Sequence, residues 1–248
     1  MENELKRPGG ELASRPLHFF WVVDCSGSMT GEKIGTVNHA IQSTIPDMAS
    51  EARNNPNAQL LIRTLKFSTG ASWVTAAPVP VEDFAWDDLS AEGVTDLGKA
   101  FELLAAQLTI PPMSDRALPP VIVLLSDGQP TDDYKKALET LKRLPWGKKA
   151  VKIAISIGQD ADRDVLIEYT GNNELVLSAN NPNALVKMIK WASTAASMVS
   201  APASRPVGTE PGAAFPAEGG ENGLDYPPLV IDIDNIPAGD EIDGNDVW

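Results

Sequence analysis

The sequence predicts an α/β fold with three layers, in which helices cover both faces of a doubly wound, mostly parallel sheet that has one antiparallel edge strand. Two observations carry this prediction. Short apolar runs typical of buried strands alternate with segments of helical spacing along most of the chain. Two of these runs end abruptly in a carboxylate, at Asp24 and Asp127, and ligands bind at the carboxyl ends of strands in open α/β sheets.

The first strand and helix follow a polar arm. Residues 1–15 contain a Pro-Gly-Gly step, and we expect this arm to be flexible. Residues 17–23 are nearly all apolar, as a central parallel strand should be. Thr30 is predicted to cap the next helix, with Glu32 in its first turn. Apolar residues then recur at helical spacing at Ile34, Val37, Ala40, Ile41, Ile45 and Met48.

The next segment predicts the antiparallel edge of the sheet. Residues 60–67 are predicted as a second strand, and residues 73–81 as a third strand after the turn Ser68-Thr69-Gly70. Pro78 and Pro80 cannot donate hydrogen bonds to a ladder, so the third strand belongs at an edge. The short turn between the two strands implies that they pair antiparallel.

The remaining elements alternate between helix and strand. They are a helix over 97–108, a strand over 121–125, a helix capped by Thr131 and ending near Leu144, a strand over 151–157, a helix over 164–169, a strand over 175–177 and a helix over 183–198. This alternation predicts a Rossmann-like architecture. Its right-handed crossovers bring the carboxyl ends of the parallel strands to one rim of the sheet.

Oxygen-bearing side chains gather at that rim. Asp24, Ser26 and Ser28 follow the first strand, Thr95 opens a helix, and Asp127 follows the strand over 121–125. Each feature alone has an ordinary explanation, because Ser, Thr and Asp often cap helices. Together they supply oxygens from three loops, and oxygen-only ligands suit a hard divalent cation, Mg²⁺ in particular, with Mn²⁺ as the alternative.

These residues carry a resemblance to a known family. Asp-x-Ser-Gly-Ser-Met, Thr-Asp-Leu-Gly and Ser-Asp-Gly-x-Pro-Thr-Asp, in this order, resemble the metal-ion-dependent adhesion site (MIDAS) of von Willebrand factor type A (VWA) domains. The resemblance covers residues 16–200, and within the family the chain is similar to bacterial tellurite-resistance TerY-type proteins. It implies that the serines bind Mg²⁺ directly, that the threonine does so in one state, and that the aspartates act directly or through water. A partner carboxylate would fill the remaining position, and a protein kinase and a metal-dependent phosphatase are the implied associates in a stress-response system.

Composition limits the other functional classes. The net charge of −14 disfavours binding to nucleic acids or to membrane surfaces. There is no run long enough to span a membrane. The single cysteine, Cys25, fits a reducing compartment and hence the cytoplasm, and we expect it to pack behind the loop rather than to act as a reactive thiol.

The expected function is a protein-interaction adaptor without enzymatic activity. The competing hypothesis is a metal-dependent hydrolase, of the phosphoesterase class, that uses the same ion. Hydrolysis would need a positioned acid or base, and neither His18 nor His39 lies in the three loops. Asp132 and Asp133 are candidates, but we expect them to be first-turn charges of the helix that follows them. A metal-free scaffold is disfavoured because the motif is complete.

The carboxyl-terminal part of the chain has a different composition. Residues 201–223 form a Pro/Gly/Ala-rich linker, and residues 224–248 form an acidic-hydrophobic tail. Residues 201–248 hold ten acids and one base, which is −9 of the total charge of −14. The tail is either a solvated disordered segment or a docking segment, for this domain or for a partner, through the apolar-acidic alternation of residues 229–234. In the docked state, one of its acids would compete for the metal.

Overall fold

The computed structural model describes residues 14–200 except residues 56, 128 and 160. The predicted linker and tail over 201–248, and the predicted arm apart from its last two residues, lie outside the described part. Arg15 belongs to the domain, because it opens the first strand opposite Ala58 and its guanidinium donates to the carbonyls of Arg116 and Ala117.

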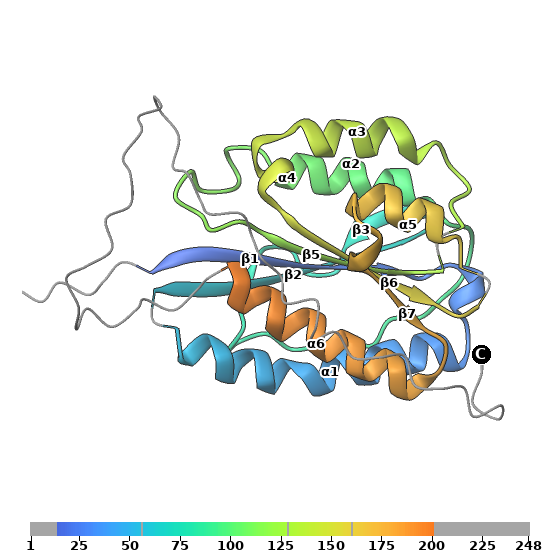
Figure 1. Cartoon of the computed structure of the whole chain (residues 1–248), viewed down its shortest axis with the longest axis horizontal. Helices are drawn as coiled ribbons and strands as arrows, with labels where there is room; N and C mark the ends of the chain where they lie inside the picture. The colour runs from blue at the N-terminus through green and yellow to red at the C-terminus, as the bar shows by residue number, and fades with distance from the viewer. Residues whose placement is uncertain (1–13, 56, 128, 160, 201–248) are drawn as a thin grey trace, which may run out of the picture.

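A single twisted sheet forms the middle layer (Figure 1). Its strand order is β3-β2-β1-β5-β6-β7, and the short β4 also pairs with β2. The parallel strands are β1 (Arg15–Asp24), β2 (Ala58–Ser68), β5 (Val121–Ser126), β6 (Val151–Ile157) and β7 (Val176–Ala179). The predicted α/β fold with a mostly parallel sheet is confirmed.

The antiparallel edge differs from the prediction. The structure has two short strands, β3 (Gly70–Trp73) and β4 (Val79–Pro80), in place of one strand over 73–81, and both pair antiparallel with β2. Pro78 and Pro80 supply no amide hydrogen to a ladder, so the chain leaves β2 between the two pieces. The guanidinium of Arg63 donates to the carbonyls of Thr75 and Ala76 in the interval.

Helices cover both faces of the sheet (Figure 1). One face carries α1 (Glu32–Arg53) and α6 (Pro182–Ser200), and the other carries α2 (Leu97–Gln107), α3 (Tyr134–Arg143), α4 (Pro145–Lys149) and α5 (Arg163–Thr170). The alternation of side chains along β1 fills both cores: Phe19 and Trp21 pack in the core with α1 and α6, and Phe20 and Val22 in the core with α2 and α3. Short 3-10 turns occur at Gly27–Met29 and Asn173–Leu175.

Helix starts were predicted less well than the sheet. Thr30 is not a cap: the N-cap position of α1 is Gly31, with φ of 76°, and the Thr30 hydroxyl donates to the carbonyl of Gly27. Thr131 does not cap α3 either, because that position is held by Asp133. Pro145 was expected to end the helix, but it begins a further short helix, α4, that was not predicted. Proline fits the first turn of a helix, where its missing N–H is not needed.

The topology places one crevice at the carboxyl rim of the sheet. From β1 the chain crosses through α1 to β2 on one side, whereas α2 leads to β5 on the other side of β1. The loops after β1 and β5 therefore diverge, as they do at the switch point where doubly wound sheets bind ligands. Asp24 ends β1, and Asp127 directly follows β5.

Candidate metal centre

Asp24 is a fully buried carboxylate at the end of β1. Its Oδ1 accepts a 2.9 Å hydrogen bond from the backbone N–H of Ser26, and its Oδ2 accepts a 2.6 Å bond from the hydroxyl of Ser126. Burial raises the pKa of Asp24 to about 6, the hydrogen bonds from these serines oppose the rise, and the charge of Asp127 adds to it. Asp24 is thus held in one orientation next to a second carboxylate.

The two serines of the first loop lie side by side. The side-chain oxygens of Ser26 and Ser28 are 3.0 Å apart, with Ser26 buried and Ser28 exposed. The 3-10 turn over Gly27–Met29 brings them together. The N–H of Gly27 donates to the carbonyl of Gly93 at 3.0 Å, and a Cβ at Gly27 would lie 3.2 Å from that oxygen. The absence of a side chain at Gly27 therefore lets the first loop lie against the loop that carries Thr95.

Asp127 presents a buried side-chain oxygen at the start of the third loop. The residue is 2% exposed, and its Oδ1 has no hydrogen-bond partner among the described residues. Its backbone carbonyl accepts a 2.9 Å bond from the N–H of Asp162, which fixes the loop after β5. Within the described part of the chain, neither Asp127 nor Asp24 forms an ion pair. A buried carboxylate oxygen in this state is strongly unfavourable unless a cation or a donor satisfies it.

Thr95 lies in the second loop and is 5% exposed. Its backbone is held by Thr131 of the third loop: the N–H of Thr131 donates to the carbonyl of Thr95 at 2.8 Å, and the Thr131 hydroxyl accepts from the N–H of Thr95 at 3.1 Å. Through Gly93 and Thr131, hydrogen bonds connect the loop of Thr95 to both other loops. The three predicted loops therefore meet at one rim.

The donor set fits a hard divalent cation. It consists of two buried carboxylates and three hydroxyls, and Oδ1 of Asp127 among them has no hydrogen-bond partner in the described residues. No group of three or more His, Cys, Asp or Glu residues suited to a metal ion occurs in the described residues. Oxygen ligands of this kind suit Mg²⁺ or Mn²⁺.

Comparison with known sequences identifies the family. The sequence pattern of the von Willebrand factor type A domain matches residues 20–191, more than half of the chain. The chain belongs to this family. VWA domains are metal-dependent protein-interaction modules. No curated protein sequence matches the chain.

Several solved structures share the fold of this VWA domain. The pilus adhesin SpaC from Lactobacillus rhamnosus GG has a TM-score of 0.61 and 14% identity, over 76% of this chain and 31% of the adhesin. The ArnB paralog VWA2 from Sulfolobus acidocaldarius has a TM-score of 0.54 and 20% identity, over 71% and 44%. Mussel byssus proximal thread matrix protein 1 with a zinc-occupied MIDAS motif has a TM-score of 0.54 and 18% identity, over 75% and 47%. The chain thus spans less than half of each of these proteins.

Sequence reasoning missed three residues that organise the rim of this VWA domain. Ser126 holds Asp24, and Thr131 holds Thr95. Asp132 was expected to complement the dipole of its own helix, but it accepts hydrogen bonds from the N–H groups of Gly98 and Lys99 at the start of α2. All three residues belong to the motif Ser126-Asp-Gly-x-Pro-Thr-Asp132. The motif therefore marks them in the sequence, but it does not show which residues of the other loops they contact.

The cysteine and the buried histidine of the VWA domain have structural roles. Cys25 is buried behind the first loop, and burial raises the pKa of its thiol to about 12, so the expected packing role is confirmed. His18 is buried near the start of β1, stacked on Phe20. His39 is exposed on α1. Neither histidine lies in the three loops.

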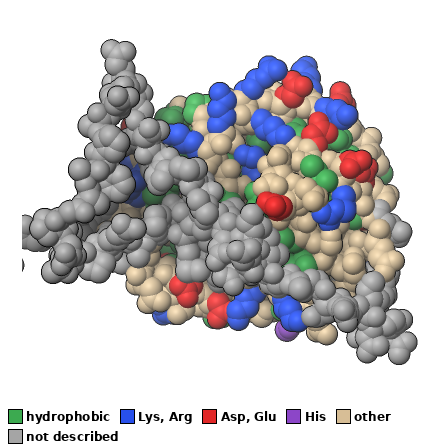
Figure 2. All heavy atoms as spheres, in the orientation of Figure 1, with side chains coloured by type: hydrophobic (Ala, Val, Ile, Leu, Met, Phe, Trp, Pro, Cys, Tyr) green, Lys and Arg blue, Asp and Glu red, His purple; other side chains and the backbone are tan. Residues whose placement is uncertain are grey.

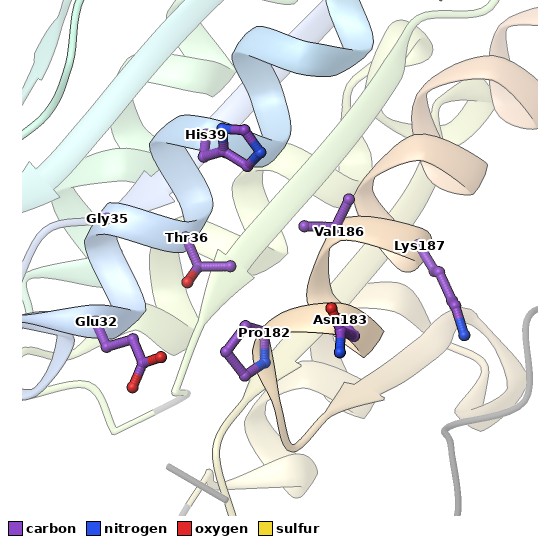
Figure 3. Close-up of a pocket in the computed structure, with 8 residues that line it drawn as sticks. All are labelled: Glu32, Gly35, Thr36, His39, Pro182, Asn183, Val186 and Lys187. Atoms are coloured by element: carbon purple, nitrogen blue, oxygen red, sulfur yellow. The ribbon is translucent and has the colours of Figure 1, made fainter. Parts of the chain in front are cut away.

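A hollow of about 690 Å³ lies between α1 and α6 of the VWA domain (Figure 3). Glu32, Gly35 and His39 line it from α1, and Pro182 and Val186 from α6. Both helices begin at the carboxyl rim, so the hollow opens beside the first loop. Lys187 also lines the hollow from α6. On the face shown in Figure 2, Lys and Arg side chains, with Asp and Glu among them, gather over the layer of α2 and α3. In the described part of the chain, no helix is long and apolar enough to cross a lipid bilayer.

Proposed function

We propose that this VWA domain binds a protein partner through a divalent cation held by Asp24, Ser26, Ser28, Thr95 and Asp127, and that a carboxylate of the partner completes the coordination. The observation that carries the proposal is the buried Oδ1 of Asp127, which has no hydrogen-bond partner in the described part of the chain, at the rim where the hydroxyls of Ser26 and Ser28 lie 3.0 Å apart. A cation would stabilise this rim, because two neighbouring buried carboxylates repel each other and are costly to keep ionised without a positive charge.

Mg²⁺ is the proposed ion, with Mn²⁺ as its substitute. Mg²⁺ prefers octahedral oxygen coordination and keeps water where the protein supplies no ligand. Neutral hydroxyls and two carboxylates leave the ion with residual affinity for one more anionic oxygen. The zinc in the MIDAS motif of the mussel protein supports a divalent cation in this fold, and the oxygen-only donors of this chain favour a harder ion.

Binding rather than catalysis is the function that the rim favours. Asp132, a candidate base, is engaged with the amides of Gly98 and Lys99, and His18 and His39 lie outside the three loops. Similar structures include a pilus adhesin and a thread matrix protein, which fits a non-enzymatic role. The alternative, a metal-dependent phosphoesterase, would reveal itself as Mg²⁺-dependent turnover of generic phosphoesters that is lost in Asp127→Asn.

The setting remains a prediction from the sequence. The tellurite-resistance-like system, the kinase and phosphatase partners and the cytoplasmic location rest on the motif resemblance and on the single buried cysteine. The similar structures described above, a pilus adhesin and a mussel byssus thread matrix protein among them, give no support for such a system.

The test uses the whole chain as bait in an extract of its source cell, with Mg²⁺ or with chelator. We expect specific partners only with Mg²⁺, and none with Asp127→Asn. Exposed Asp87→Asn is the matched control and should capture the same partners as the wild type. Calorimetry with Mn²⁺ alone should show binding to the wild type and to Asp87→Asn only. Equal capture in chelator and by Asp127→Asn would show that the metal rim is not the interface.

A further inference from the structure

We infer that Thr131 and Asp132 are positioning residues for the proposed metal centre, which hold the loop of Thr95 against the loop of Asp127 without binding the ion themselves. The inference rests on the proposed function, because it explains how one proposed ligand is placed relative to another. It gives a role to two residues that are not among the five proposed ligands of the ion.

Thr131 binds both backbone groups of Thr95, its carbonyl and its N–H. Its N–H donates to the Thr95 carbonyl at 2.8 Å, and its hydroxyl accepts from the Thr95 N–H at 3.1 Å. The same hydroxyl lies 3.5 Å from Oδ1 of Asp96, to which it donates. A threonine hydroxyl has one proton and two acceptor positions, so this single group serves both neighbours. Because Thr95 is buried, both of its backbone groups need these partners.

Asp132 anchors the helix that begins two residues after Thr95. Its Oδ1 accepts from the N–H of Gly98 at 2.9 Å, and its Oδ2 accepts from the N–H of Lys99 at 3.2 Å. The residue at the N-cap position of α2, Asp96, makes no capping bond to its own helix. A carboxylate from the third loop therefore satisfies the free amides at the start of α2, where the helix dipole also favours negative charge.

Gly98 makes this close approach possible. A Cβ at position 98 would lie 2.7 Å from Oδ2 of Asp132 and 3.0 Å from the backbone Cα of Tyr134. On the other side of the loop, Asp96 accepts from the N–H of Gly70 at 2.7 Å, and its own N–H donates to the carbonyl of Ser68. The Thr95 loop is thus held between the β2–β3 turn and residues 131–132.

These contacts set the position of Thr95 relative to Asp127, two of the proposed ligands of the ion. Asp127 is four residues before Thr131 on the same loop, and the Asp127 carbonyl is itself fixed by the N–H of Asp162. The position of Thr95 relative to Asp127 then depends on the bonds to Thr131. An octahedral ion tolerates little displacement of its ligands, so loosening this connection weakens the site even though every proposed ligand is still present.

The experiment is a double-mutant cycle read by calorimetry with Mn²⁺ and Mg²⁺ alone, on the full chain. Thr131→Val keeps the shape and removes the hydroxyl, and we expect roughly fivefold weaker binding, in the range of one lost hydrogen bond. Thr131→Ser keeps the hydroxyl and should stay within about twofold of the wild type. Thr140→Val is the control, because that hydroxyl bonds only within α3, to the carbonyl of Lys136.

Coupling to Thr95 separates positioning from general stability. In a Thr95→Ala background, Thr131→Val should weaken binding no further, because the ligand that it places is already gone. Asp132→Asn gives a second, independent variant if Thr131→Val does not fold, and it should weaken binding in the same direction. If folded variants at positions 131 and 132 bind the ions as tightly as the wild type, the inference is wrong. It is also wrong if Thr131→Val weakens binding further in the Thr95→Ala background. Either result leaves the proposed function standing. A wild-type chain that binds neither ion overturns the proposed function together with the inference.

Discussion

The hydroxyl of Ser126 donates a 2.6 Å hydrogen bond to Oδ2 of Asp24, across 102 positions of sequence. Both residues are fully buried. The bond follows from the register of the sheet: Val23 pairs with Leu125, so the next residue of each strand lies at the same edge. It leaves Oδ1 of Asp24 to the backbone N–H of Ser26 and stabilises the ionised form of a carboxylate whose burial disfavours ionisation.

Removing that hydroxyl should change both the titration and the metal affinity. In Ser126→Ala we expect the pKa of Asp24 to rise further above its ordinary value, because a donor to the ionised form is lost. The free energy of unfolding should fall by about 1–3 kcal/mol for the lost buried bond. Mn²⁺ binding, measured at pH 6 and pH 8, should weaken more at pH 6, where more of the carboxyl is protonated. Ser156→Ala, at the β6 position that pairs with Ser126, should leave the pH dependence of binding unchanged.

Ser28→Ala should weaken metal binding without destabilising the fold. Ser28 is exposed, and its side-chain oxygen lies 3.0 Å from that of buried Ser26. We expect roughly tenfold or greater loss of Mg²⁺ affinity and a free energy of unfolding within about 0.5 kcal/mol of the wild type in metal-free buffer. Calorimetry and chemical denaturation measure the two quantities, with Ser43→Ala on α1 as the control. A large loss of stability without a change in affinity would make Ser28 a structural residue.

The sequence predicted the fold because apolar runs and helical spacing are local signals. It also placed Asp24 and Asp127 at one rim, since the carboxyl ends of parallel strands meet there. The bonds within the rim were not predictable in this way. Asp132 stands just before α3, and only the packed structure shows that its oxygens reach the amides of α2. Such contacts depend on how loops that are distant in the sequence pack against each other, which local secondary-structure propensity does not predict.

The edge of the sheet shows the same limit. Pro78 and Pro80 predicted an edge strand, but not that Arg63 would occupy the break between β3 and β4, where its guanidinium donates to the carbonyls of Thr75 and Ala76. A long side chain on the neighbouring strand thus replaces ladder bonds that the backbone would otherwise make. Nothing in the alternation of residues 73–81 indicates this.

His18 should make the metal-free domain sensitive to acid. Burial, with a smaller contribution from the charge of Arg63, lowers the pKa of His18 from 6.5 to about 4. Between these values the unfolded chain binds a proton that the native state does not, so stability falls as the pH drops from about 6.5 to about 4. The pKa difference corresponds to about 3 kcal/mol.

His18→Phe should remove this loss, because phenylalanine can keep the stacking on Phe20 and cannot be protonated. Asp24 acts in the opposite sense: its raised pKa gives stability that is present below about pH 4 and is lost as the pH rises through about 6. Urea denaturation of wild type, His18→Phe and the control His39→Gln from pH 4 to 7 isolates the histidine. Identical pH profiles for wild type and His18→Phe would contradict the assignment.

Gly93→Ala should disturb the rim through the backbone. Gly93 has φ of +81°, and a Cβ there would lie 2.4 Å from the Thr69 hydroxyl oxygen. Its carbonyl accepts from the N–H of Gly27, so the strain would reach the first loop. We expect a loss of about 1–3 kcal/mol in the free energy of unfolding and weaker Mn²⁺ binding. Gly70→Ala is the comparison: φ is +80°, and an added Cβ would meet no atom of the described residues within 4 Å beyond its chain neighbours, so the loss should be only about 1 kcal/mol.

Deleting residues 224–248 tests whether the acidic tail competes for the metal. This segment lies outside the described residues, and its seven acids include Asp232 and Asp234 within an apolar stretch. The α6 helix ends toward the edge where the parallel strands begin, so its 19 residues, about 28 Å in length, separate its end from the rim (Figure 1). A flexible linker over 201–223 would explore roughly 25 Å, which is close to that separation, and the tail itself adds further reach.

Such a tether raises the local concentration of carboxylates into roughly the millimolar range, enough for a weak contact to occupy the ion part of the time. We therefore expect the truncated chain to bind an acidic partner more tightly in Mg²⁺ than the full chain does. Asp232→Asn combined with Asp234→Asn should reproduce part of this gain, whereas Glu210→Gln in the linker should not. If the truncation leaves Mg²⁺-dependent affinity unchanged but abolishes the capture of some other protein, the tail is an independent docking segment and never meets the ion.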